Sequence, residues 1–423
     1  MKKYLFLCLL FCWCQSQPLH AQDVPELSID RGIKRYVSVD FELVSNLMII
    51  PVHINNSGPL YFILDSGVKN TIITRLFASD TLQINQAERI KIHGHGTGKP
   101  LEAYRSEGNI LKMGRMTGKD LQFNVLVEDI FHLSEQLGRR INGIIGYDLL
   151  SQFIVHINYQ AQAIRFYPRE HFPSRWYGFF YRELPMEIYN QKPYIPVGLH
   201  PYPDKKPEKV KMLIDTGSSE SFWVFPKDKP VLQPPQRKAL LYLGKGLNGN
   251  IFGWRARIYE ASLAGFTLDG PIVAYPDSNS IRLEALHEDR YGTLGADVLH
   301  RFNVIFDYQG ERMFVARNTH YGKPFRINTT GLVLKAEIPE LPIYQIAYIR
   351  RGSHAEKSGL QVDDQIIELN GKPTHNMSLD GLIKHMNKVS PGQTVYIVVS
   401  RNGERKYFSY DAEDILGDYR DVP

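Results

Sequence analysis

The chain of 423 residues contains one pattern twice, about 150 residues apart. In each copy an Ile-Pro-Val segment opens a short alternating strand, a turn and an apolar strand follow, and the sequence then reads Asp-Ser-Gly or Asp-Thr-Gly. The first copy reaches its aspartate at Asp65 and the second at Asp215. Self-similarity at a fixed spacing is typical of a duplicated structural unit. The sequence therefore predicts two similar halves.

A second pair of markers supports the duplication. The segments INGIIGYDLLSQFIVHINYQ and YGTLGADVLHRFNVIFDYQG each contain two apolar residues and a glycine, then an aspartate, a short helical turn and a hairpin of alternating strands. Gly146 and Gly295 lie 149 residues apart. Alternation dominates both halves, and helical signals are brief. We therefore expect an all-β architecture, with two tandem pseudo-symmetric β-barrel lobes at residues 36–170 and 178–320.

These four motifs, in this order, resemble those of the aspartic proteases of the retropepsin and pepsin-like types. The resemblance covers roughly residues 36 to 320. The loops at Asp65 and Asp215 correspond to its catalytic loops, and the Ile-Ile-Gly and Thr-Leu-Gly elements to its two apolar-apolar-Gly motifs. The resemblance implies an endopeptidase that acts on a polypeptide, and two fused lobes that form one site in a monomer.

The expected chemistry follows from two carboxyl groups held close together. Like charges at short range cannot both ionise easily, so such a pair shares a proton. The ionised carboxylate can take a proton from a water lodged between Asp65 and Asp215, while the protonated one donates to the scissile carbonyl. The alternative for each aspartate is that it only begins a turn. For the whole chain, the alternative is an inactive, protease-like scaffold that binds peptides.

Residues next to the aspartates have supporting roles in this interpretation. Glycine permits the tight turn in each loop. The family implies that two hydroxyls cross-link the loops, and the next serine of the second loop could donate to its aspartate. Lobe one has Val68 at that position, so we expect Asp65 to be the more easily protonated partner. The support residues are Ser66, Gly67, Thr216, Gly217 and Ser218.

Two glycine-rich segments are predicted to form mobile hairpins that contact substrate. They are His93–Gly98 and Gly244–Gly249, with Gly94, Gly96, Gly246 and Gly249 as contact positions. The second segment also fits the Gly-x-Gly-x-x-Gly dinucleotide motif, but the residues after it are predicted to form a strand, whereas that motif requires a helix. His93 and His95 have the spacing of metal ligands, but no third ligand is evident. No metal or cofactor is expected.

The repeat stops after Asn318, and residues 325–412 resemble a PDZ domain of the bacterial protease-associated type. The segment GSHAEKSGLQVDDQIIELNG carries this resemblance. A PDZ domain binds a peptide tail by strand addition beside a helix, with backbone amides around the terminal carboxylate. The candidate loop for that role is Gly331, Leu332, Val333 and Leu334, and the helix at Leu382–Val389 is expected beside it. A PDZ fold used only for packing is the alternative.

The N-terminal residues 1–21 are predicted to be a cleavable signal peptide. Lys2 and Lys3 precede an apolar run of eleven residues, which is too short to span a bilayer, and Ala21 offers a cut site. All three cysteines lie within this segment, so the mature chain has none. We expect a secreted or periplasmic protein without a stable membrane anchor. Its net charge of +5 and the lack of a basic block argue against nucleic acid as a partner.

Overall fold

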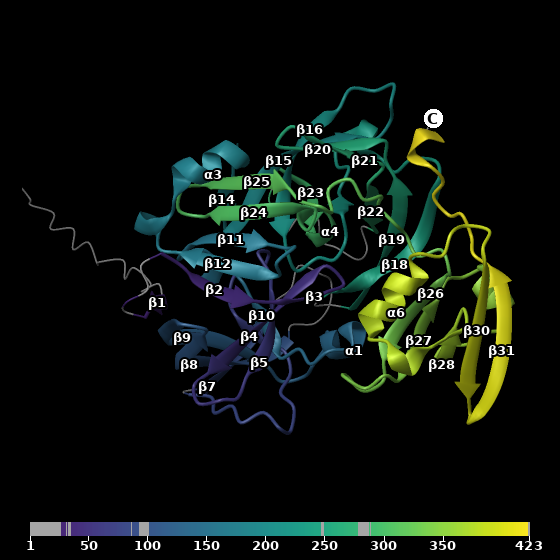
Figure 1. The fold of residues 1–423 in the computed structure, drawn as a ribbon, viewed down its shortest axis with the longest axis horizontal. Helices are drawn as coiled ribbons and strands as arrows, with labels where there is room; N and C mark the ends of the chain where they lie inside the picture. Colours follow the sequence, from purple (N-terminus) through teal and green to yellow (C-terminus); the bar gives the residue numbers. More distant parts are fainter. Residues whose placement is uncertain are drawn as a thin grey trace, which may run out of the picture.

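The computed structural model describes residues 27–30, 32, 35–85, 87–92, 101–246, 249–277, 287 and 289–421. Figure 1 shows three parts: lobe one below, lobe two above, and the C-terminal domain to the side of both. Four sheets build them. The expected all-β fold, followed by a small domain with helices, is confirmed.

Lobe one is built on a nine-stranded sheet. Its strands are β1 (Leu27–Ile29), β3 (Glu42–Val44), β4 (Leu47–Ile54), β5 (Leu60–Leu64), β6 (Ile72–Ile73), β7 (Ala87–Ile92), β8 (Leu101–Met113), β9 (Met116–Leu126) and β10 (Gly143–Ile145). Two short helices accompany it, α1 (Leu133–Leu137) and α2 (Tyr147–Leu150).

Lobe two is built on a ten-stranded sheet. Its strands are β14 (Glu187–Tyr189), β15 (Lys192–His200), β16 (Glu208–Asp215), β17 (Phe222–Val224), β18 (Lys238–Gly246), β19 (Gly249–Arg257), β20 (Glu260–Leu263), β21 (Phe266–Asp269), β22 (Ile272–Pro276) and β23 (Arg290–Gly295). Helix α4 (Ala296–Leu299) follows β23, and the 3-10 turn η2 spans Pro230–Leu232.

The two lobes have the same core topology. The order β9-β6-β10-β5-β4 in lobe one matches β22-β17-β23-β16-β15 in lobe two. The strand directions agree as well. Strand β10 runs parallel to β5, as β23 does to β16. Strand β6 runs antiparallel to β10, as β17 does to β23. Even burial repeats: residues 61–70 and 211–220 have the same pattern of buried and exposed side chains. The duplication predicted from the sequence is therefore present in the fold.

A six-stranded sheet joins the lobes. It contains β2 (Val37–Asp40), β11 (Ile154–Asn158), β12 (Ala163–Tyr167), β13 (Arg182–Pro185), β24 (Phe302–Asp307) and β25 (Arg312–Arg317). Strands β11 and β24 pair antiparallel at its centre, with Ile154 opposite Asp307 and Ile157 opposite Val304. His156 lies opposite Ile305, which is the equivalent residue of lobe two 149 positions later, so the pseudo-twofold axis passes between β11 and β24 at this pair. The hairpins of both lobes thus share one sheet.

A single hydrophobic cluster runs through both lobes, while the C-terminal domain has a core of its own. Helix α3 (Ser174–Phe180) and the turn η1 (Arg169–His171) link the lobes. The C-terminal domain contains β26 (Leu332–Ala336), β27 (Tyr344–Ile349), α5 (His354–Lys357), β28 (Gln365–Leu369), β29 (Lys372–Pro373), η4 (Thr374–Asn376), α6 (Leu379–Met386), β30 (Thr394–Arg401) and β31 (Glu404–Asp411), and η5 (Tyr419–Asp421) follows it.

The C-terminal domain contacts both lobes. Asp380 of α6 accepts a hydrogen bond from the backbone of Ser45 in lobe one at 2.8 Å. The ring of Tyr348 in β27 lies 6.1 Å from that of Tyr242 in the lobe-two hairpin. After the domain, the chain returns to lobe two, where Asp414 pairs with Arg237 at 2.7 Å. None of the described helices is both long enough and apolar enough to span a bilayer.

Candidate active site

The two aspartates occupy equivalent strand ends. Asp65 directly follows β5, and Asp215 is the last residue of β16. In lobe one the Asp65 N–H donates to Ile145 of the parallel strand β10 at 2.8 Å. In lobe two Asp215 pairs with Gly295 of β23. Each aspartate therefore lies at the end of a central strand that has one parallel and one antiparallel neighbour.

Both carboxyl groups border the same small volume. A methyl group on the Cα of Gly67 would lie 3.1 Å from Oδ1 of Asp65 and 3.3 Å from Cγ of Asp215. On Gly217 it would lie only 2.3 Å from Cγ of Asp65. Glycine is required at 217 because a side chain there would displace the Asp65 carboxyl group. The structure thus brings together the two aspartates that the sequence places 150 residues apart.

Hydroxyl groups cross-link the two loops symmetrically. Thr216 Oγ1 accepts the Ser66 N–H at 2.9 Å and donates to the Leu64 carbonyl at 2.7 Å. Ser66 Oγ accepts the Thr216 N–H at 3.1 Å and donates to the Ile214 carbonyl at 2.8 Å. Both side chains are fully buried. These four bonds hold the loops in one relative position, which is the cross-link that the family resemblance implies.

Each carboxylate also accepts a hydrogen bond inside its own loop. Gly67 N–H donates to Asp65 Oδ1 at 2.7 Å, and Gly217 N–H donates to Asp215 Oδ1 at 3.0 Å. The bond expected from the Ser218 hydroxyl to Asp215 is not formed among the described residues; only the Ser218 backbone N–H contacts that residue, at its carbonyl, at 3.3 Å. Ser218 is therefore not the source of any difference between the aspartates.

The pKa of Asp65 is raised well above its ordinary value of 3.8. Burial is the largest cause, and the charge and hydrogen bond of Asp215 raise this pKa further, while the Gly67 N–H lowers it. The expectation that Asp65 protonates easily agrees with this direction. The cause differs, because burial and the neighbouring carboxylate dominate rather than a missing serine.

The apolar-apolar-Gly motifs lie against the backs of the loops. A Cβ on Gly146 would lie 2.2 Å from the Asp65 carbonyl oxygen, and one on Gly295 would lie 2.2 Å from that of Glu220. The next N–H in each motif donates to the loop, from Tyr147 to Val68 at 3.1 Å and from Ala296 to Ser218 at 2.7 Å. Only glycine allows this close approach of the backbones.

Two further aspartates brace the loops, and the sequence reasoning assigned them no role. Asp148 accepts the N–H of Thr71 at 2.9 Å, and Asp297 accepts the hydroxyl of Ser221 at 2.5 Å. The signal was available, because both pairs recur at the same spacing of about 150 residues. Their carboxylates fix the end of each loop.

Lys192 is a third residue that the sequence reasoning missed. Tyr194 faces Leu213 across β15 and β16, so Lys192 at the start of β15 lies level with Asp215 at the end of β16. Its charge lowers the pKa of Asp65, opposing the burial effect. Burial in turn lowers the pKa of Lys192, while the two aspartates raise it. The corresponding residue of lobe one is the buried Leu47.

The lobe-two glycine segment forms a hairpin as predicted. Strands β18 and β19 pair along their length, with Gly246 opposite Gly249 at the end of the ladder. Because a strand follows these glycines, there is no helix N-terminus to receive a pyrophosphate. In lobe one, β7 and β8 form the equivalent hairpin, with Ile92 opposite Leu101. Its glycines Gly94 and Gly96, and also His93 and His95, lie outside the described residues.

The proposed PDZ loop is shorter than predicted. Gly331 alone lies in a loop, with φ of +79°, and its carbonyl accepts the Arg350 N–H at 2.8 Å. Leu332, Val333 and Leu334 instead open strand β26, because Leu332 and Leu334 pack into the domain core. The helix expected at Leu382–Val389 spans Leu379–Met386, since Ser378 caps it by accepting the Gly381 N–H.

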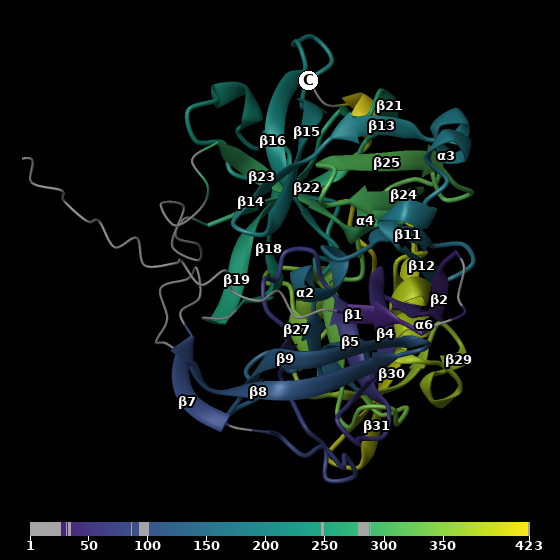
Figure 2. The ribbon, with the colours of Figure 1, turned by 90° about the vertical axis from the view of Figure 1, so that its left-hand side faces the viewer.

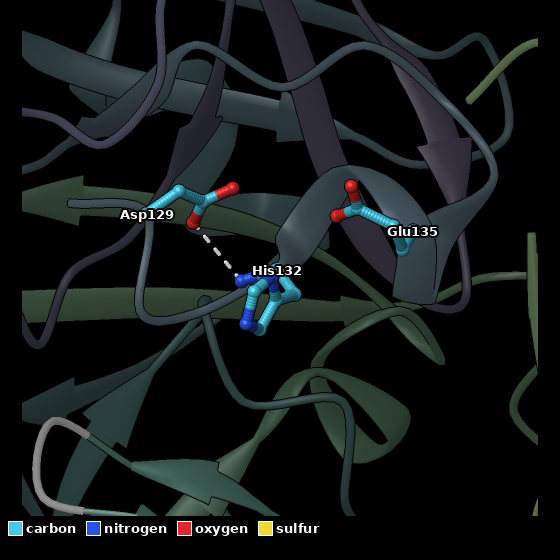
Figure 3. A group of neighbouring side chains, drawn as sticks. All are labelled: Asp129, His132 and Glu135. Carbon is cyan, nitrogen blue, oxygen red and sulfur yellow. Dashed lines mark hydrogen bonds between the residues drawn. The ribbon is translucent and has the colours of Figure 1, made fainter. Parts of the chain in front are cut away.

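One group of possible metal ligands lies apart from the aspartate pair, just before and within α1. Figure 3 shows Asp129, His132 and Glu135, whose ligand atoms all lie within 4.8 Å of one another. The bond drawn between Asp129 and His132 comes from the His132 backbone N–H. The guanidinium of Arg75 pairs with both carboxylates. A positive charge therefore already occupies this position, and the group serves as an ion-pair network.

Comparisons with known proteins identify the two kinds of domain. Residues 50–149 match the family model described as aspartyl protease, and residues 328–400 match that of the PDZ domain. The fold is similar to the aspartic proteinase of Irpex lacteus at 11% identity and a TM-score of 0.45, covering 68% of this chain and 99% of that one. No protein with a curated description matches significantly. The chain thus contains an aspartyl protease domain and a PDZ domain.

Proposed function

We propose that this chain, which carries an aspartyl protease domain and a PDZ domain, is an aspartic endopeptidase. The observation that carries the proposal is the meeting of Asp65 and Asp215 at one point, with their loops cross-linked by Ser66 and Thr216. A structural aspartate needs no carboxylate neighbour, whereas two carboxyl groups at this range can share a proton.

The raised pKa of Asp65 supports a division of roles within the proposed pair. Asp65 holds the shared proton and donates it toward the scissile carbonyl as that carbonyl becomes tetrahedral. Asp215 is ionised and takes a proton from the attacking water. When the C–N bond breaks, the proton taken by Asp215 goes to the leaving amine, and a hydroxyl of the tetrahedral intermediate returns a proton to Asp65 as the carbonyl re-forms, so the pair ends with one proton as it began. No covalent intermediate forms on the protein.

The PDZ domain is proposed to bind peptide tails. The Gly331 loop and the start of β26 offer the backbone groups that such binding uses. The expected signal peptide and the mature chain without cysteine support a secreted or periplasmic location as part of this proposal.

The test is incubation of the wild-type protein with a diverse peptide library between about pH 3 and pH 8, the range over which a coupled carboxyl pair titrates. Asp65→Asn and Asp215→Asn are run in parallel, with Asp120→Asn as a matched control because Asp120 is exposed. We expect cleavage by the wild type and the control, and none by the two site variants. Peptide binding without cleavage in all four proteins would establish the scaffold function instead.

A further inference from the structure

Helix α3 presents aromatic side chains on two different sides. Tyr177 and, one turn on, Tyr181 point into the protein. Trp176, Phe179 and Phe180 have the i, i+3, i+4 spacing that places residues together on one side of a helix. A helix that is apolar on both sides is normally buried on both. Here only one side is covered.

The inner side is fixed on a buried aromatic cluster. The Tyr177 hydroxyl contacts His156 Nδ1 at 3.1 Å and the Tyr167 hydroxyl at 3.0 Å. The Phe172 ring stacks on that of Tyr177 with centroids 5.2 Å apart and planes at 4°. Burial lowers the pKa of His156 to about 4, so its ring stays neutral near pH 7 and the cluster carries no charge. The contacts of Tyr177 therefore fix the orientation of α3, and the aromatic side chains on the other side of the helix stay on the outside.

The outer side is open to solvent. Trp176 is 63% exposed, Phe179 85% and Phe180 62%, with the rings of Trp176 and Phe180 5.2 Å apart. The exposed cation Arg175 precedes them, and the stretch from His171 to Arg182 contains no acidic residue. Exposed clusters of large apolar side chains mark interaction surfaces, because leaving them in water is costly.

We propose that α3 is a docking surface for the interface of a lipid bilayer. Trp and Phe beside a basic residue are the side chains that interfacial helices insert among headgroups and acyl chains. Arg175 is the one charged residue of α3, and the exposed Glu170 and Glu183 that flank the stretch each stand next to an arginine, so the net positive charge suits an anionic headgroup layer. Figure 1 shows α3 at the outer edge of the molecule, a convex position that fits a fluid, planar partner better than a preformed protein pocket. The contact is peripheral and reversible, because so short a helix cannot cross.

The position of α3 also orients the molecule. Figure 2 shows α3 on one side and the hairpin strands β7 and β19 on the other. A protein docked through α3 therefore directs these hairpins away from the lipid surface and toward the aqueous compartment. The docking surface and the aspartate pair are thus separate features, and neither inference depends on the other.

The test uses the chain from Gln22 onward, which contains every described residue and lacks the N-terminal apolar run that would itself bind lipid. Co-sedimentation is measured with vesicles of phosphatidylethanolamine plus phosphatidylglycerol, and with vesicles of phosphatidylcholine alone. A variant with Trp176, Phe179 and Phe180 all replaced by Ser is compared with the wild type. The matched control replaces Tyr396 and Tyr407 by Ser, since these are 62% and 74% exposed on the C-terminal domain.

We expect the wild type and the control to bind the anionic vesicles, and the triple variant to partition on the order of 100-fold less. The tryptophan emission of the wild type, to which Trp223 and Trp254 also contribute, should shift to shorter wavelength on binding. Phe179→Ser alone, at the most exposed of the three positions, should bind less with an unchanged melting temperature, which separates docking from folding. Equal sedimentation of all proteins, or none of the wild type, would overturn the proposal. Self-association that disappears in the triple variant without vesicle binding would assign the surface to a second copy.

Discussion

The cross-link between the loops gives the sharpest test of how the two lobes make one site. Thr216→Val keeps the shape of the side chain but removes its hydroxyl. The Ser66 N–H and the Leu64 carbonyl then lose their partners, at present 2.9 and 2.7 Å from Thr216 Oγ1. Both groups lie in the fully buried interior between the lobes, where water cannot replace the lost bonds.

The magnitude follows from these two groups. A buried polar group without a partner costs about 1–3 kcal/mol, so Thr216→Val, which leaves two such groups, should lower the free energy of unfolding of the protease lobes by about 2–6 kcal/mol. Ser66→Ala removes the other two bonds and should cost a similar amount. Both are large against the roughly 5–15 kcal/mol by which typical domains are stable.

Urea unfolding followed by tryptophan fluorescence measures this change selectively. Trp176, Trp223 and Trp254 all lie in or between the protease lobes, and residues 325–412 contain no tryptophan, so the signal does not report on the PDZ domain. Thr267→Val is the control, since Thr267 is exposed. The reasoning fails if Thr216→Val unfolds within about 0.5 kcal/mol of the control, the scatter expected of ordinary surface substitutions.

Further outcomes follow from the same geometry. Gly217→Ala should abolish cleavage because its Cβ would lie 2.3 Å from Asp65 Cγ, whereas Gly58→Ala, with no atom within 4 Å, should not change the turnover rate. Lys192→Met removes a charge that lowers the pKa of Asp65. The alkaline limb of the pH–rate profile, where the shared proton is lost, should therefore move to higher pH. The control Lys209→Met, at an exposed position, should leave this limb in place. The folded state holds the Asp65 proton more tightly than the unfolded state does, so ionisation of Asp65 lowers the stability of the wild type as the pH rises above 3.8. Asp65→Asn has no such proton to lose. Its melting temperature should therefore exceed that of the wild type at pH 7, and the difference should disappear below about pH 3.8. Tyr348→Ala should speed amide hydrogen exchange in β18 and β19, because the ring contacts of Tyr348 with Tyr242 and Phe252 are lost, and unchanged exchange would show that these contacts do not restrain the hairpin.

The sequence predicted those parts of the fold that repeat. Two copies of one motif predicted two copies of one topology, and the ends of β5 and β16 carry the aspartates as expected. The shared central sheet was not predicted, because the pairing of β11 with β24 joins strands about 150 residues apart and leaves no local signal. Alternation shows which side of a strand is buried but not which distant strand lies beside it.

Site residues that belong to a sequence motif could be predicted, whereas a residue that reaches the site only through the pairing register of two strands could not. Asp65 and Asp215 are marked by their own loops, but Lys192 joins them only through the ladder between β15 and β16. At Gly331 a motif led to a wrong local prediction. A loop of four residues was expected, but three of them belong to strand β26 because Leu332 and Leu334 pack into the core of the domain.

Duplication alone would give two equivalent aspartates, yet catalysis by a shared proton requires that one of them hold it. In this chain the loops themselves stay symmetric, since each carboxylate accepts a bond from its own glycine and each hydroxyl bonds the opposite loop. The strands next to them differ, since lobe one has buried Leu47 where lobe two has Lys192, whose charge lowers the pKa of Asp65 against the effect of burial. An apolar neighbour favours the protonated form of a carboxyl group, and a cation favours the ionised form. Divergence at one strand position therefore adds a charge next to the pair that opposes the effect of burial on Asp65, and the duplicated loops alone do not supply this charge.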